Sequence, residues 1–218
     1  MPSTSYHLIP RLATDFSKFV LVAITDNPME PIGYAAGIPF VGPKDLLELP
    51  DGGYDEVFEL GVSDFDTRQT PTMLAALAIA LMPKHRGRGV SETLAKALCN
   101  LARSYGFGHL VVPVRPTHKT SEPFTPMEEY VLRARPDGAP TDPWIRLHWR
   151  LGATIVKVCP SSMTMRASIP AWEKATGMAF PTSGLYPIPD ALAPLRVDCE
   201  RDEAVLIEPN VWMDYLIR

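Results

Sequence analysis

The sequence predicts one α/β domain in which a mixed sheet carries helices on both faces. Three observations predict it. The chain has 218 residues, of which 46% are apolar, enough to build a sizeable core in a single domain. Apolar, β-branched runs typical of strands alternate with segments whose apolar residues recur at helical spacing. Gly and Pro mark the boundaries between these segments.

The first third of the chain favours strands. Residues 19–24 and 32–40 predict a hairpin, with a turn at Asp26, Asn27 and Pro28 between them. Residues 41–70 predict a long connection that holds one short strand near 56–60. Residues 73–82 are rich in alanine, and their length suits a strand or a helix, so periodicity alone leaves this segment open.

The rest of the chain alternates helices and strands. A helix is predicted from Val90 to a stop at Gly106, because apolar residues recur there on one face. The later predicted elements are a strand at 109–114, a helix opened by a capping box at 125–128, a helix opened by Asp142 and ended by Gly152, strands at 153–158 and 163–167, a short helix around Trp172, and weaker strands near Val197 and Val205.

Composition and charge exclude several classes of protein. The net charge of −4 argues against a protein that coats nucleic acid. The longest apolar run, 73–82, is well short of the ~20 residues that span a bilayer, and no signal peptide is visible, so we expect no membrane association. Three widely spaced cysteines indicate reduced thiols and a cytoplasmic protein. The histidines and cysteines lack paired ligand spacing, so no metal is expected. The oligomeric state stays open, a homodimer included.

A glycine-rich basic loop lies between residues 73–82 and the helix that starts near residue 90. A helix start presents unpaired N–H groups and the positive end of the dipole, which suits a pyrophosphate. Gly87 and Gly89 let the backbone approach phosphate oxygens, and Lys84, Arg86 and Arg88 add positive charge. The alternative is a basic surface turn before an amphipathic helix. The spacing fits neither a P-loop nor a dinucleotide fingerprint.

This loop resembles the cofactor motif of the GNAT superfamily of acetyltransferases, which runs Arg or Gln, two residues, Gly, one residue, then Gly or Ala. Ser91 departs from the last position, but it is small and can cap the helix. The resemblance implies acetyl-CoA or another acyl-CoA as co-substrate. It also implies that residues 73–82 form a strand that splays from the next strand, with pantetheine in the gap. The cofactor-binding residues that it implies are Leu81, Met82, Arg86, Gly87, Arg88, Gly89, Val90 and Ser91.

The fold that this resemblance implies is a GNAT-like mixed, splayed sheet flanked by helices. We expect the acyltransferase domain to span residues 1–168, with a proline-rich C-terminal extension, 169–218, packed on it. Most members begin with a strand and two helices that cover the acceptor site. The segment before residue 19 is too short for both helices, so the extension or a partner could build that side.

A second resemblance points to catalytic residues. Residues 147–153 are similar to a late GNAT helix in which a Tyr often protonates the departing thiolate, and His148 holds that position. A histidine with a pKa near neutrality can do this, although a core histidine is the alternative. Residues 114–119 and 142–144 resemble an atypical branch with an insertion, here 116–141. That branch includes polyketide-synthase loading domains and domains beside nitrilases. There a Thr and a His are implicated in malonyl-CoA decarboxylation, which implicates Thr117. The alternative is that the Thr117 hydroxyl forms a hydrogen bond with a backbone group after Pro116.

Three functions follow from these resemblances. The first is acyl transfer from an acyl-CoA to a small-molecule amine. The second is a malonyl-CoA decarboxylating S-acyltransferase that loads a carrier protein. The third is an acyl-CoA-binding module without catalysis. The general base and the acceptor stay open.

Overall fold

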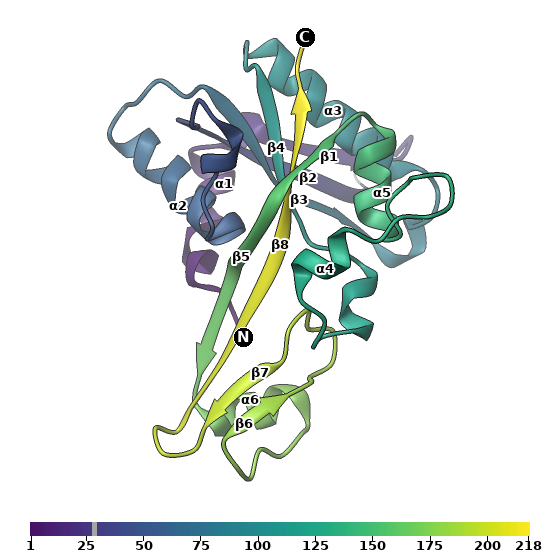
Figure 1. Ribbon diagram of the computed structural model, residues 1–218. Helices are drawn as coiled ribbons and strands as arrows, with labels where there is room; N and C mark the ends of the chain where they lie inside the picture. Colours follow the sequence, from purple (N-terminus) through teal and green to yellow (C-terminus); the bar gives the residue numbers. More distant parts are fainter. Residues whose placement is uncertain (28–29) are drawn as a thin grey trace.

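The computed structural model describes residues 1–27 and 30–218, so Pro28 of the predicted turn lies outside the described residues. Its centre is a sheet with the strand order β1-β2-β3-β4-β8-β7-β6, and β5 pairs with β8 beside this path (Figure 1). Only β3 and β4 pair in parallel among these strands, so the sheet is mixed, as predicted. The strands are β1 (Val20–Ile24), β2 (Pro31–Phe40), β3 (Met73–Leu81), β4 (His109–Val114), β5 (Thr154–Ala167), β6 (Gly184–Tyr186), β7 (Leu195–Asp198) and β8 (Glu203–Leu216).

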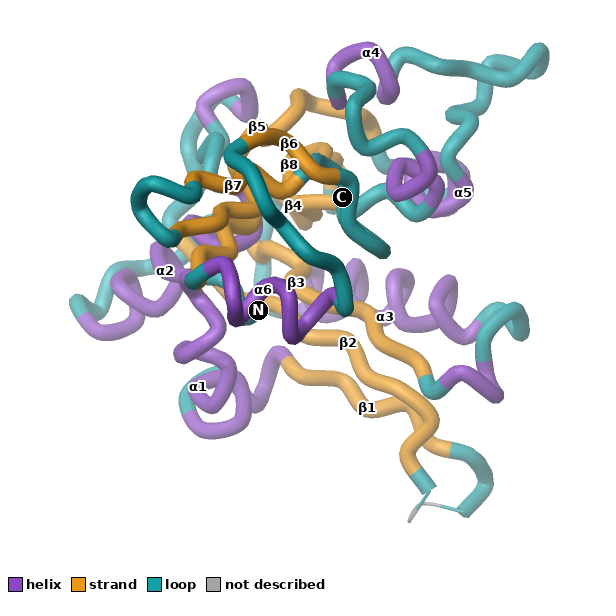
Figure 2. Tube along the Cα trace, turned by 90° about the horizontal axis from the view of Figure 1, so that it is seen from below, coloured by secondary structure: helices purple, strands orange, loops and turns teal. Residues whose placement is uncertain are grey.

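Helices cover the sheet on both faces. Every residue of β4 from Leu110 to Val114 is buried, and successive residues of a strand point to opposite faces, so both faces are shielded there. Figure 2 shows α3 along β3, with α1 and α2 grouped away from it. The α-helices are α1 (Ile9–Thr14), α2 (Gly53–Asp66), α3 (Val90–Ser104), α4 (Met127–Val131), α5 (Pro143–Arg150) and α6 (Ile169–Thr176). Short 3₁₀ helices lie at Thr4–Leu8, Ser17–Phe19, Leu46–Glu48, Pro83–His85 and His118–Ser121.

The prediction for residues 41–70 is wrong. The structure places the 14-residue helix α2 where one short strand near 56–60 was expected. Val57, Phe58, Gly61 and Val62 are buried at helical spacing, and α2 packs against β2 and β5. Gly61 allows this close approach, because a Cβ there would lie 2.6 Å from a side-chain carbon of Ile38.

Two other local predictions are corrected. The capping box at 125–128 does not form, because the Thr125 hydroxyl donates to Glu122 Oε2 at 3.1 Å and Pro126 occupies the N-cap of α4. The two strands expected at 153–158 and 163–167 are one strand, β5. Its register against β8 shifts between Cys159 and Met163, a bulge that accommodates Pro160 within one continuous strand.

The C-terminal segment has two parts. A satellite made of α6, β6, β7 and the start of β8 lies at the lower end of the molecule (Figure 1) and has its own small core. From there β8 runs back between β4 and β5, so the predicted boundary at residue 168 divides strands that pair within one sheet. Trp212 of β8 is fully buried, and its Nε1 donates to the carbonyl of Pro50 at 2.8 Å. The residues of the satellite core are Trp172, Phe180, Ile188, Ala191, Leu195, Val197, Ala204 and Leu206.

Within the described ranges, none of the helices has both the length and the apolar character that a bilayer crossing requires.

Candidate active site

The gap between β3 and β4 confirms the splayed sheet. The two strands pair only through Leu74 with Leu110 and Ala75 with Val111. Just beyond, the register of β3 against β2 shifts so that Leu77 is the extra residue of a bulge. A bulge bends its strand and ends local pairing. The remainder of β3 therefore diverges from β4 and leaves one of its edges unpaired.

Two neighbouring cavities lie in this gap. The inner cavity, of about 310 Å³, lies between Ala76–Ile79 and Val112–Arg115 and is closed by Tyr54, Trp144, His148, Met163 and Asn210. The outer cavity, of about 770 Å³, runs from Arg86 and Ser91 past Ile79–Leu81 to Arg115–Thr117, Thr120, Trp144 and Asp190. Ile79, Arg115 and Trp144 line both cavities, so the two are neighbours. Together they lead from the basic loop to the buried histidine.

The amides at the start of α3 form the first half of the site. Gly87 and Gly89 have φ of 74° and 79°, a region that favours glycine, and α3 begins at Val90. The first helical bond runs from the Thr93 N–H to the Gly89 carbonyl. The amides of residues 87–92 donate to no acceptor in the described chain. They are therefore free to bind an anion.

The charges of the loop are divided. Lys84 pairs with Glu30 at 2.8 Å, so that ammonium group already has a partner. Arg86 and Arg88 are exposed and form no ion pair with any described residue. Ser91 lines the outer cavity and does not cap α3 through its hydroxyl, because Gly89 occupies the N-cap and no side-chain cap bond forms there. The suggested capping role of Ser91 is corrected accordingly.

The edge of β3 presents a further donor. The Met82 N–H donates to the Ile32 carbonyl of β2 at 2.9 Å. Because successive amides of a strand point to opposite edges, the Leu81 N–H faces the gap. Leu81 lines the outer cavity, whereas Met82, Gly87, Arg88, Gly89 and Val90 are not among its lining residues. The structure thus brings Leu81, Arg86 and Ser91 to one cavity.

His148 lies at the inner end of the gap. Its ring is 2% exposed, and Nδ1 is 2.7 Å from the hydroxyl of Tyr215. Nε2 has no partner among the described atoms, and Trp144 packs edge-on at 4.7 Å between ring centroids. Burial lowers the pKa of His148 to about 4, so the expectation of a pKa near neutrality is wrong: the ring has been removed from water.

The tautomer of His148 follows from Tyr215. The Tyr215 hydroxyl is buried, and His148 Nδ1 is its only hydrogen-bonding partner in the described structure. If Nδ1 donated, the phenol hydrogen would be left without an acceptor, which costs about 1–3 kcal/mol. Tyr215 therefore donates to Nδ1, and the neutral ring carries its hydrogen on Nε2. His148, which lines the inner cavity, therefore carries an N–H donor that has no partner among the described atoms.

Thr117 is placed apart from His148. It lies in the outer cavity and is exposed, and its side chain forms no capping bond at the start of the following 3₁₀ helix. The alternative role, in which the Thr117 hydroxyl forms a hydrogen bond with a backbone group, is therefore not seen at this helix start. His148 lies in the inner cavity alone. The structure does not bring the two residues to one cavity.

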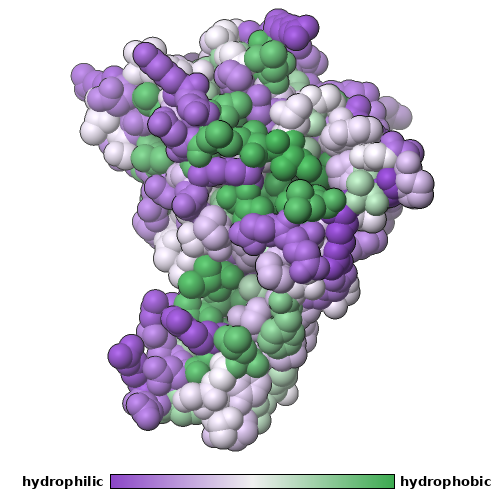
Figure 3. Space-filling view, viewed as in Figure 1, coloured by the Kyte–Doolittle hydropathy of each residue, from purple (hydrophilic) through white to green (hydrophobic). Residues whose placement is uncertain are grey.

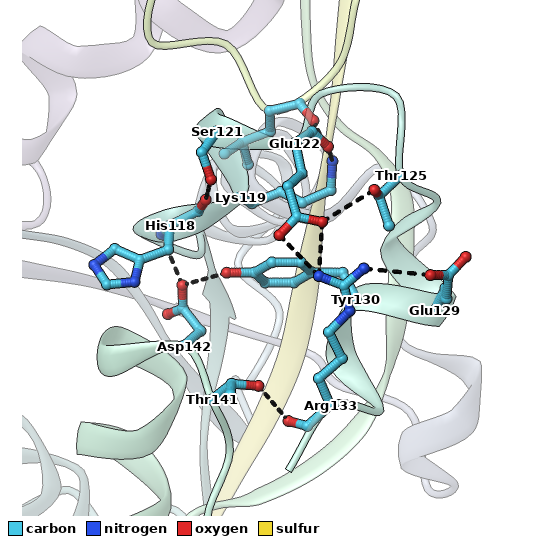
Figure 4. Close-up of polar contacts among 11 residues, drawn as sticks. His118, Lys119, Ser121, Glu122, Thr125, Glu129, Tyr130, Arg133, Thr141 and Asp142 are labelled. Carbon is cyan, nitrogen blue, oxygen red and sulfur yellow. Dashed lines mark hydrogen bonds and ion pairs between the residues drawn. The ribbon is translucent and has the colours of Figure 1, made fainter. Parts of the chain in front are cut away.

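A polar network holds the insertion and α5 in place (Figure 4). Asp142 caps α5 by accepting from the amides of Trp144 and Ile145, as predicted, and it also accepts from the Tyr130 hydroxyl at 2.9 Å and the His118 amide at 2.8 Å. The buried Lys119 donates to the carbonyls of Glu122 and Leu192. Since α5 carries His148, this network positions the donor in the inner cavity.

Two residues of the site escape the sequence analysis. Asn210 of β8 is 1% exposed and lines the inner cavity with an unpartnered Oδ1. Tyr54 at the start of α2 forms another wall of that cavity. The one signal for Asn210 in the sequence is that a polar residue stands within a predicted apolar strand. Arg115 lines both cavities while it pairs with Glu208 at 2.8 Å.

Comparisons with known proteins agree with this geometry. A profile of the acetyltransferase (GNAT) family matches residues 3–125. The arginine N-acetyltransferase avaD of Aspergillus versicolor is 36% identical over 77% of this chain, and the match spans 65% of that protein's length. Two solved structures share the fold at a TM-score of 0.60 and 16% identity: the loading GNATL domain of CurA from Lyngbya majuscula, over 97% of this chain and 83% of that one, and the GphF GNAT-like decarboxylase in complex with isobutyryl-CoA, over 99% and 86%. On the family profile and the splayed sheet, this chain belongs to the acetyltransferase (GNAT) family.

Proposed function

We propose that the protein transfers an acyl group, acetyl among them, from an acyl-CoA to the amine of a small molecule. The observation that carries the proposal is the arrangement of two neighbouring cavities along the open edge of β3, with the unpaired amides at the start of α3 near one and His148 at the other. The 36% identical relative, whose name gives arginine as its acceptor, supports an amine. The three free thiols of Cys99, Cys159 and Cys199 support the cytoplasm as the place of reaction.

The outer cavity and the basic loop beside it suit CoA. The amides of residues 87–92 have no acceptor within the described chain, which fits a diphosphate group. Arg86 and Arg88 supply charge for further phosphate oxygens. The Leu81 N–H, which faces the gap, would donate to pantetheine or to the thioester carbonyl oxygen, where it stabilises developing negative charge.

Bound acyl-CoA supplies the activated thioester. The acceptor nitrogen attacks the carbonyl carbon, so that a C–N bond forms and the C–S bond breaks, and the proton that leaves nitrogen ends on the CoA sulfur. The neutral His148 ring donates a hydrogen bond from Nε2 to the departing thiolate while Tyr215 holds Nδ1. Because its pKa is about 4, we assign His148 hydrogen-bond donation at pH 7 instead of the expected protonation of the thiolate.

One incubation tests the proposal against its alternatives. The protein is mixed with acetyl-CoA or malonyl-CoA, with and without an amine panel and a carrier protein, and free thiol and carbon dioxide are followed. We expect amine-dependent thiol release from acetyl-CoA, reduced about 100-fold in His148→Gln. His118→Gln, an exposed histidine outside both cavities, is the matched control and should keep full activity.

The other outcomes assign the other functions. Carbon dioxide from malonyl-CoA that disappears in His148→Gln would indicate the decarboxylating carrier-loading reaction, in which Thr117 would also take part. Tight binding of acetyl-CoA without thiol release would indicate a binding module. If neither ester binds, the proposed function is rejected.

A further inference from the structure

Asn210 is a buried polar side chain in the central strand β8. It follows Pro209 in β8 and precedes the buried residues Val211, Trp212 and Met213. Its Nδ2 donates to the carbonyl of Pro113 on the neighbouring strand β4 at 3.1 Å. The reverse orientation of the amide would set Oδ1 against that carbonyl oxygen, so the hydrogen bond fixes Oδ1 as the atom that is left without a partner.

The oxygen of the Asn210 amide is an acceptor without a donor, in a residue that lines the inner cavity. Oδ1 of Asn210 is buried and has no hydrogen-bonding partner in the described part of the chain. An unsatisfied buried acceptor costs about 1–3 kcal/mol, so a donor supplied by a bound molecule would be favourable here. His148 Nε2 is the other unpartnered polar atom of the inner cavity. Two residues that line the cavity therefore hold one unpartnered N–H donor and one unpartnered C=O acceptor.

The acyl transfer proposed above needs this combination. The departing thiolate and the carbonyl oxygen of the thioester are acceptors, which suit the His148 N–H. The attacking amine is the partner that brings N–H groups, and a primary amine has two of them. One can bond to Asn210 while the other is lost in the reaction. A thiol is a weak donor and gains little from such an acceptor.

The surroundings indicate which amines fit. Arg115 is the one charged side chain that lines the described inner cavity, and Glu208 already pairs with it. The lining lacks a free carboxylate for a second positive charge. Tyr54 and Met163 also line the adjoining cavity. The lining of that cavity is mostly apolar. Figure 3 shows hydrophobic residues gathered over the middle of the face that is drawn in Figure 1. Its remaining lining residues are Met1, Pro2, Ser3, Tyr6, Ile9 and Met165.

We propose that Asn210 Oδ1 accepts an N–H from the acceptor nitrogen and so orients a primary amine with an apolar body toward the thioester. The inference rests on the proposed function. Asn210 is then a substrate-binding residue that favours amines over thiols. The bond it makes exists only once the acceptor is present, which is why the oxygen has no partner in the protein itself.

The test compares two variants with 2-phenylethylamine as the probe. Asn210→Leu removes the oxygen and keeps the size, whereas Asn210→Asp keeps an oxygen at the position of Oδ1. A carboxylate oxygen would face the carbonyl oxygen of Pro113, so the buried Asp side chain takes up a proton and its hydroxyl donates to Pro113 in place of the amide. Asn210→Asp is therefore the conservative variant that should restore amine binding, while a structural effect of Asn210→Leu would also change the Kd for acetyl-CoA. We expect the KM for the amine to rise about tenfold in Asn210→Leu and to stay within about threefold of wild type in Asn210→Asp. The Kd for acetyl-CoA should not change in either variant.

A second measurement uses the wild-type protein alone, in case the variants do not fold. The amide product N-acetyl-2-phenylethylamine keeps one N–H, and its N-methyl derivative has none. The first should inhibit about tenfold more strongly. Equal inhibition overturns the assignment of Asn210.

The remaining outcomes separate the two proposals. An unchanged amine KM in Asn210→Leu, or a weakened Kd for acetyl-CoA in its place, overturns the role of Asn210 while acetylation of amines by the wild type stands. If the wild-type protein acetylates no amine, the proposed function fails and takes this inference with it.

Discussion

Replacement of His148 by glutamine should change how stability depends on pH. Burial lowers the pKa of the folded ring from 6.5 to about 4, and the unfolded chain keeps the ordinary value. Between these two values the unfolded state binds more protons, so the free energy of unfolding falls as the pH is lowered through 6.5 toward 4. The full difference of the two pKa values corresponds to about 3 kcal/mol.

The effect can be measured at two pH values. From pH 7 to pH 5 this one group should remove about 2 kcal/mol from the free energy of unfolding. Glutamine keeps hydrogen-bonding atoms near Tyr215 and does not titrate. Urea unfolding of the wild type and of His148→Gln, followed by tryptophan fluorescence, isolates the contribution, because the other titrating groups are common to both proteins.

The wild type should therefore lose about 2 kcal/mol more than His148→Gln between pH 7 and pH 5. Equal losses in the two proteins would refute the reasoning. They would mean that the ring is charged or hydrated in the folded state, and the neutral Nε2–H donor would no longer hold.

Three further substitutions test other parts of the site. Arg86→Ala should weaken acetyl-CoA binding about tenfold in calorimetry. Lys84→Ala should change the binding little, because the ammonium group of Lys84 is already paired with Glu30. Equal effects of the two substitutions would contradict the division of charge in the loop. Gly89→Ala should lower the free energy of unfolding, measured in urea, by roughly 1–2 kcal/mol. The φ of Gly89 is 79° and an added Cβ meets no described atom within 4 Å, so backbone strain alone acts. Unchanged stability would count against this conformation. Asp142→Ala should cost about 2 kcal/mol or more in thermal unfolding and reduce kcat, since α5 and the insertion share this carboxylate; Asp142→Asn should retain part of both.

Much of the fold could be predicted because its signals are local. The helix α3 and its stop at Gly106, where φ is 75°, follow from spacing and one glycine. The cap of α5 follows from Asp142 and Pro143. α2 could not be recognised as easily, because its buried positions include Gly53, Asp55 and Gly61, which do not contribute an apolar stripe.

The central position of β8 depends on distant partners. Glu208, Pro209, Asn210 and Asp214 interrupt its apolar pattern, so the sequence indicates only a weak strand near Val205. In the structure Glu208 pairs with Arg115, and Pro209 lies opposite the bulge of β5. Such contacts between segments far apart in the chain compensate the polar residues, and no local pattern shows them.

The candidate site divides in the same way. Arg86–Ser91 and His148 are found from short motifs, because a helix start and a late helix are continuous in sequence. The burial that lowers the pKa of His148 depends on Trp144 and Tyr215 packed around it, the latter 67 residues away. The carbonyl of Pro113, which accepts the hydrogen bond from Asn210 Nδ2, is 97 residues away on β4. Only the assembled sheet therefore shows that Oδ1 has no partner among the described atoms.

The central claim is that the unpaired amides at the start of α3 hold the diphosphate of CoA. The most direct measurement follows the backbone amide NMR shifts of residues 87–92 while CoA is added, with pantetheine, which lacks the diphosphate, as the comparison. The account predicts that these amide protons move downfield with CoA and stay in place with pantetheine. Binding of CoA that leaves these six amides unmoved would contradict it.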